Sequence, residues 1–140
     1  MQRFTEIDVA IIQNCERYRI PLYVVRSKVD THIRNVMNDL EPDSDERDKE
    51  LYKQARQTCI DSTREDFVKN LQKAQLAKRD VFIVSSSVMR AVVTKRFNSQ
   101  VSNGMIDEAS LLEAVLKETY ARLHKDYLTV VKQNMVRVGP

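Results

Sequence analysis

The chain has 140 residues, of which 42% are hydrophobic and 31% are charged, and its formal net charge is +3. This length allows one domain with a modest core. The small positive charge is spread along the chain, which argues against a nucleic-acid-binding protein. No apolar run approaches the length of a membrane span, and the N-terminus lacks the apolar stretch of a signal peptide. Cys15 and Cys59 have no metal-ligand or redox spacing, so we expect buried, reduced thiols in a cytoplasmic protein.

The first predicted elements are a helix and a strand. An amphipathic helix is expected over Thr5–Arg19, capped at its start by Thr5. Its apolar residues recur at helical spacing: Ile7, Ile11 or Ile12, and Cys15. Ile20 and Pro21 end the helix, and Leu22–Arg26 follows as a short apolar run. Such β-branched runs are typical of a buried parallel strand.

The residues that follow this strand carry the first functional signal. Ser27-Lys28-Val29-Asp30 stands where the strand ends, and open α/β sheets bind ligands outside the carboxyl ends of their strands. A lysine stem there can lie along the face of a planar base while its ammonium stays solvated. The carboxylate can accept two hydrogen bonds from adjacent N–H groups of a guanine edge, each contributing about 1.5–3 kcal/mol. The alternative is a solvated turn that opens a helix.

The middle of the chain is predicted to be helical. Asp30 or Thr31 can cap a second helix that carries Ile33 and Met37. The acidic segment Glu41–Glu50 is expected to be a solvated loop that becomes the first turn of another helix. It lacks the glycine of an EF-hand loop, so we expect no metal site in it. From about Lys49, either one long bent helix or two shorter helices continue past Leu71.

The last third is expected to hold the second strand and the clearest helix. Val81–Val84 is an apolar run that ends in Ser85-Ser86-Ser87. The predictions downstream are a helical or irregular segment over Val88–Phe97, a polar linker over Asn98–Asn103 closed by Gly104, and a helix over Asp107–Asp126. The tail from Thr129 is expected to fray.

Two apolar strands, each between helices, predict a parallel pair joined by a right-handed crossover. Such a pair leaves an open edge at the first strand, and edges of this kind are normally covered or paired. The only glycines are Gly104 and Gly139, so the chain has no glycine-rich phosphate loop. We therefore expect an α/β half domain: residues 1–127 as the second half of a nucleotide-binding domain and residues 128–140 as a tail.

Two loop motifs and the surrounding sequence resemble the corresponding segments of the immunity-related (interferon-inducible) GTPases. Ser27-Lys28-Val29-Asp30 resembles their guanine-specificity motif, usually Asn/Thr-Lys-x-Asp, and Val84-Ser85-Ser86-Ser87 falls at their second guanine loop. The resemblance starts at Arg3-Phe4, continues through Cys59-Ile60-Asp61-Ser62-Thr63-Arg64-Glu65, and ends at Ser87. It implies the C-terminal half of a three-layer GTPase domain of the P-loop type. GTP or GDP would be the ligand, with magnesium only in a full-length parent.

The resemblance also implies a role for each loop residue. Lys28 would stack on the base and Asp30 would bind its N1 and N2 groups. The Ser86 N–H would approach O6, Ser27 would support the loop, and Ser85 would fix the turn. Self-association driven by GTP, or membrane contact, would involve the part of the parent that is missing here.

The chain departs from the family pattern in ways that limit its activity. Ser27 replaces Asn or Thr, and Ser87 stands where the family often has Lys. The phosphate-loop Lys and Ser, the switch Thr and the Asp-x-x-Gly element have no counterparts and would precede Met1. We expect no catalytic residue and no GTP turnover in this chain alone. The alternatives are a degenerate GTPase remnant, a non-enzymatic helical interaction protein, or an unrelated helical bundle in which both apolar runs are helical.

Overall fold

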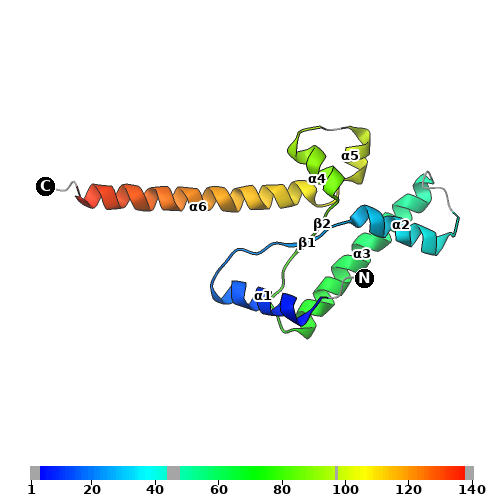
Figure 1. The fold of residues 1–140 in the computed structure, drawn as a ribbon, viewed down its shortest axis with the longest axis horizontal. Helices are drawn as coiled ribbons and strands as arrows, with labels where there is room; N and C mark the ends of the chain where they lie inside the picture. Colours follow the sequence, from blue (N-terminus) through cyan, green and yellow to red (C-terminus); the bar gives the residue numbers. More distant parts are fainter. Residues whose placement is uncertain (1–3, 44–47, 97, 138–140) are drawn as a thin grey trace.

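The computed structural model describes residues 4–43, 48–96 and 98–137, and over these ranges the chain is a mixed α/β protein dominated by helices (Figure 1). The elements follow in the order α1 (Glu6–Arg17), β1 (Val24–Arg26), α2 (Val29–Leu40), α3 (Lys49–Lys73), β2 (Val81–Ile83), α4 (Ser86–Val93), α5 (Ser99–Gly104) and α6 (Glu108–Arg137). No helix in the described ranges is long and apolar enough to cross a membrane.

The two strands pair side by side in parallel, which confirms the central prediction from the sequence. Val24 is level with Val81, and Arg26 is level with Ile83. Both strands are shorter than the predicted runs 22–26 and 81–84. The pair ends after the Val84 N–H donates to the Arg26 carbonyl at 2.9 Å, because the chain that follows β1 turns at Lys28 into α2. The helical-bundle alternative is therefore wrong.

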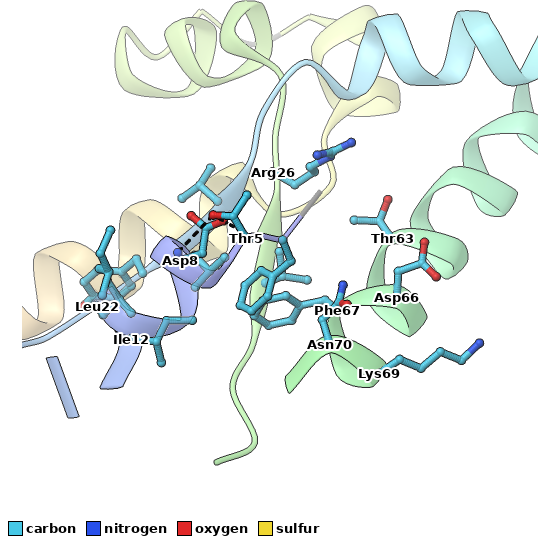
Figure 2. Close-up of a pocket in the computed structure, with 16 residues that line it drawn as sticks. Thr5, Asp8, Ile12, Leu22, Arg26, Thr63, Asp66, Phe67, Lys69 and Asn70 are labelled. Carbon is cyan, nitrogen blue, oxygen red and sulfur yellow. Dashed lines mark hydrogen bonds between the residues drawn. The ribbon is translucent and has the colours of Figure 1, made fainter. Parts of the chain in front are cut away.

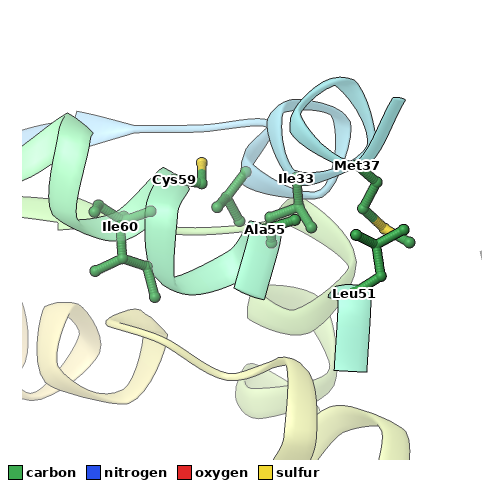
Figure 3. Close-up of a cluster of buried hydrophobic side chains, with 8 residues drawn as sticks. Ile33, Met37, Leu51, Ala55, Cys59 and Ile60 are labelled. Atoms are coloured by element: carbon green, nitrogen blue, oxygen red, sulfur yellow. The ribbon is translucent and has the colours of Figure 1, made fainter. Parts of the chain in front are cut away.

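The larger core lies between α2, α3 and β2 (Figure 3). On α2 and α3 the buried side chains recur every four residues, so that one stripe of each helix faces the other. The members are Val29, Ile33 and Met37 on α2, Leu51, Ala55, Cys59 and Ile60 on α3, and Ile83 on β2. Ile83 is fully buried. Burial raises the pKa of the Cys59 thiol, as expected for a reduced cysteine that packs as a small apolar residue.

A second cluster joins α1 to the C-terminal half of α3. Ile12, Phe67 and Leu71 are buried there, and Val24 and Val81 of the strands pack against them. Tyr23 and Phe82 contact each other with ring centroids 6.3 Å apart. The Tyr23 hydroxyl donates to the Ala114 carbonyl of α6 at 3.2 Å. Helices α1 and α3 therefore pack on one face of the strand pair, and α6 is anchored at the side that carries Tyr23.

The starts of α1 and α3 agree with the sequence prediction, and the start of α2 does not. Thr5 caps α1 in a reciprocal pair with Asp8, as predicted for Thr5. The α3 segment is a single helix, capped by Asp48, whose carboxylate accepts from the N–H groups of Glu50 and Leu51. Neither Asp30 nor Thr31 caps α2, because the helix begins earlier, at Val29, with Lys28 in the cap position.

The C-terminal third is more helical than predicted. The predicted linker over Asn98–Asn103 is wrong: Asn98 caps the short helix α5 by accepting from the Val101 N–H at 2.8 Å. The predicted fraying from Thr129 is also wrong within the described residues, since α6 continues without a break to Arg137. The expected boundary between residues 127 and 128 therefore falls inside a helix.

Candidate guanine-recognition edge

The structure brings the two predicted loops together at the carboxyl ends of β1 and β2. The Val29 N–H, in the first loop, donates to the Val84 carbonyl at 3.4 Å. Val84 in turn donates to the Arg26 carbonyl at 2.9 Å. These two main-chain bonds hold the residues Ser27, Lys28 and Asp30 beside the turn of Ser85 and Ser86. All five predicted residues lie at one edge of the sheet.

Lys28 has an unusual backbone for its position. Its φ of 61° and ψ of 32° place it in the left-handed region, which costs a residue with a Cβ roughly 1–2 kcal/mol. Four other described non-glycine residues have positive φ, and all of them follow the C-terminus of a helix: Arg19, Asp43, Gln75 and Lys95. Such positions commonly adopt this conformation. Among the five, Lys28 alone precedes a helix, so its strain is not explained by a helix C-cap.

The side chains of Asp30 and Ser27 are exposed, and neither has a partner among the described residues. Within the described residues, the Asp30 carboxylate accepts no hydrogen bond and forms no ion pair. It lies in the first turn of α2, where a negative charge is favourable, but it does not cap the helix. The Ser27 hydroxyl likewise has no partner in the described ranges. Both side chains are therefore available to a ligand.

Ser85 is buried and fixes the second turn. Its N–H donates to Glu108 Oε1 at 2.8 Å, its hydroxyl lies 2.8 Å from that of Ser87, and the same oxygen accepts from the Val88 N–H at 3.4 Å. Ser85 is thus the N-cap of α4. Among the described residues the Ser86 N–H has no acceptor. It is a free donor in the first turn of α4, where the helix dipole adds positive potential.

Sequence reasoning missed the two acidic residues that hold this turn in place. Glu108 is fully buried, and its second oxygen accepts from the Ile106 N–H at 2.7 Å. Asp107 accepts from the Ile83 N–H at 2.9 Å and pairs with Arg64 at 3.0 Å. The available signal was an acidic pair at the start of the predicted helix over Asp107–Asp126. An acidic pair at this position indicates only a favourable helix start. Nothing in the neighbouring sequence shows that these two side chains contact the end of β2.

A hollow in the described part of the chain lies beside this edge rather than in it. A groove of about 790 Å³ runs between α1, β1 and α3 (Figure 2). Its walls include Phe4, Ile12, Arg26 and Phe67. None of the five predicted loop residues lines it. Four of the five loop residues, Ser27, Lys28, Asp30 and Ser86, are exposed to solvent.

The charges around the first loop are mostly positive. His32, one turn into α2, is partly buried, and this burial lowers the pKa of its imidazole, with the nearby Arg26 lowering it further. Among the described residues, no group of three His, Cys, Asp or Glu side chains could hold a metal ion. Asp30 adds a carboxylate acceptor beside Lys28 and the Ser86 N–H at this edge.

We compared the chain with protein-family models, with curated proteins and with solved structures, and no match was found in any of the three comparisons.

Proposed function

We propose that this chain is the guanine-recognising half of a nucleotide-binding domain of the P-loop GTPase type, with GTP or GDP as its ligand. One observation carries the proposal: the Ser27–Asp30 loop and the Ser85–Ser86 turn lie side by side at the carboxyl ends of two parallel strands. The resemblance to immunity-related GTPases includes the same two loops. This resemblance suggests the family, and it suggests GTPase activity for a full-length parent protein.

The proposed contacts follow from the groups available at this edge. The Lys28 stem lies along the face of the base, and Asp30 accepts from the guanine N1 and N2 groups. The Ser86 N–H donates to O6. Adenine carries a donor where guanine has O6 and no donor at the N1 position, so both contacts discriminate against it. Ser27 supports the first loop, and Ser85 fixes the second through its bonds to Glu108 and Ser87.

The free carboxylate of Asp30 supports this assignment over the alternative, in which the loop is only a solvated turn that opens α2. If Asp30 served to open the helix, its side chain would accept from a main-chain N–H of the first turn, as Asp48 does at the start of α3. It accepts none in the described residues. The strained backbone of Lys28 is a second support, because strain of this kind is concentrated at functional sites.

The chain alone supplies base recognition and not catalysis. Phosphoryl transfer needs positioned phosphates and magnesium, and the glycines of a phosphate loop are absent from the sequence. In a cytoplasmic parent protein, that machinery would come from a part of the parent outside these 140 residues, as would any membrane contact or self-association driven by GTP. We therefore expect weak binding of guanine nucleotides and no turnover.

The test uses the 140-residue chain with GMP, because the proposed contacts involve the base. Titration followed by amide NMR should give a Kd of about 1 mM, with the largest shifts at Lys28, Asp30 and Ser86 and none of comparable size with AMP. In Asp30→Asn, GMP binding should be lost and XMP should bind instead, since the amide can present an acceptor and a donor to the altered edge of xanthine.

Asp39→Asn is the matched control, an exposed aspartate on the same helix. It should bind GMP as the unmodified chain does. Equal shifts with AMP and GMP, or a folded Asp30→Asn chain with unchanged preference between GMP and XMP, would show that this edge does not read guanine.

A further inference from the structure

The turn that carries the Ser86 N–H is held from two sides. On one side, both main-chain groups of Val84 bond to β1 and to the loop that follows it. On the opposite side, the Ser85 N–H donates to Glu108 Oε1 at 2.8 Å. Ser86 comes next and opens α4, and among the described residues its N–H has no acceptor. The position of this free N–H therefore depends on how Ser85 is held.

The start of α6 occupies the outer edge of β2, where a further strand would otherwise pair. The Ile83 N–H donates to Asp107 Oδ2 at 2.9 Å, and the Asp107 N–H donates to the Ile83 carbonyl at 3.2 Å. Glu108 takes the N–H of Ser85, two residues further along. Arg64 pairs with Asp107 at 3.0 Å and so ties the same point to α3. Two adjacent carboxylates thus fix this edge up to the turn.

We propose that Asp107 and Glu108 are positioning residues for guanine recognition, which set the preference for an oxygen at position 6 of the purine. This role rests on the proposed function. Glu108 is fully buried, and its second oxygen accepts from the Ile106 N–H at 2.7 Å, so it acts through Ser85 and not by contact with the base. The two carboxylates hold Ser85, and Ser85 holds the neighbouring N–H of Ser86 where O6 would accept from it.

Base recognition is then divided between two separate supports. Asp30 belongs to the first turn of α2 and reads N1 and N2 of guanine, whereas Ser86 reads O6 and depends on α6. A hydrogen bond weakens steeply when its donor is displaced or turned away. Loosening the start of α6 should therefore reduce discrimination at position 6 and leave discrimination at position 2 intact. A pair of residues that only stabilised the fold would affect both alike.

The test compares GMP with two analogues by NMR titration of the 140-residue chain. 6-thio-GMP has sulfur, a weaker acceptor, in place of O6, whereas IMP keeps O6 and lacks the 2-amino group. The unmodified chain should bind GMP about tenfold more tightly than either analogue, because each loses one hydrogen bond. In Glu108→Gln the preference over 6-thio-GMP should fall to about twofold, and in Asp107→Ala to about fourfold. The preference over IMP should stay near its original value in both variants.

Leu71→Ala is the matched control for lost stability. It removes a buried side chain near the C-terminal end of α3, in the cluster with α1, and should destabilise the fold while keeping both preferences. A second measurement needs no substitution. The Ile106 N–H donates to the oxygen of Glu108 that faces away from Ser85, so its amide signal should shift with GMP and IMP and much less with 6-thio-GMP at equal saturation.

The outcomes separate this role from the proposed function. Equal binding of GMP and AMP by the unmodified chain would overturn both. The positioning role alone is overturned if a chain that prefers GMP to AMP does not distinguish GMP from 6-thio-GMP, or if a folded Glu108→Gln or Asp107→Ala variant keeps its full preference at position 6 or loses both preferences together. Equal loss in Leu71→Ala, or an Ile106 signal that does not move with GMP, has the same consequence. If Glu108→Gln does not fold, Asp107→Ala and the Ile106 signal decide.

Discussion

The buried carboxylate of Glu108 accepts a hydrogen bond from the main-chain N–H of Ser85 at 2.8 Å. This bond ties the turn after β2 to the first residue of α6, 23 positions later in the chain. A fully buried carboxylate is costly unless its oxygens are satisfied, and here both accept from main-chain N–H groups. The position of the proposed O6 donor, Ser86, is thus set by the start of the longest helix.

Glu108→Gln should destabilise the fold strongly. The amide can accept through its oxygen, but its NH2 group must then face the second N–H, so one buried donor is left unpaired. We expect a loss of about 3 kcal/mol in the free energy of unfolding, measured with urea. Glu113→Gln, an exposed change on the same helix, should cost no more than about 0.5 kcal/mol. Equal losses in the two variants would mean that the Glu108 bonds contribute nothing.

Alanine substitutions in the two strands should differ in their cost to stability. Ile83→Ala removes a fully buried side chain from the core between α2 and α3, and should cost about 3 kcal/mol through lost burial and the cavity left behind. Val25→Ala removes a side chain that is 44% exposed and should cost about 0.5 kcal/mol. Urea unfolding of both variants checks the contrast. A larger loss at Val25 would indicate that something covers the face of the strand pair from which this side chain projects.

His32 should make stability depend on pH. Its pKa is lowered in the folded chain, chiefly by burial, so the unfolded chain binds the proton more readily. The contribution of the neutral imidazole is therefore complete above about pH 6.5, the ordinary pKa of histidine, and is lost as the pH falls through the folded value. Unfolding free energies at pH 7.5 and 5.5 should differ less in His32→Asn than in the unmodified chain. His124→Asn, at an exposed site, should keep the full difference. Identical pH dependence in all three proteins would contradict this assignment.

Much of this fold was predictable because its signals are local. The β-branched runs at Val24 and Val81, Thr5 as a cap, and the four-residue spacing of Ile33 and Met37 each report their own structure. The misses are of two kinds. The left-handed backbone of Lys28, which starts α2 earlier than any capping residue predicts, depends on the bond from Val29 to the distant Val84.

The second kind of miss concerns contacts that have no local trace. In the sequence, Glu108 is only an acidic residue in the first turn of a predicted helix. The fold alone brings it into contact with Ser85. Helix α6 shows a different limit. Apolar residues such as Leu116 and Leu123 recur along it and are exposed, because periodicity identifies an apolar stripe without saying what covers it. The loop residues were predicted as a candidate site from their order along the chain, and the parallel pairing of β1 and β2 places them together.

Lys28→Gly separates the backbone role of this residue from its proposed role at the base. Glycine adopts positive φ without strain, although it gains more freedom in the unfolded chain, so the net effect should be a stabilisation of about 0.5 kcal/mol. The same change removes the stem and ammonium that would cover the base. Affinity for GMP should therefore fall about fivefold, as expected for the loss of an exposed stacking contact.

Lys95→Gly is the matched control for this substitution. Lys95 has a φ of 56° and follows the C-terminus of α4, so it carries the same backbone strain away from the two loops. Its replacement should raise stability by a similar amount and leave the affinity for GMP unchanged. Urea unfolding and NMR titration of the two variants give both quantities. If Lys28→Gly binds GMP as tightly as Lys95→Gly does, the lysine side chain has no part in holding the base, and its left-handed backbone only opens the helix.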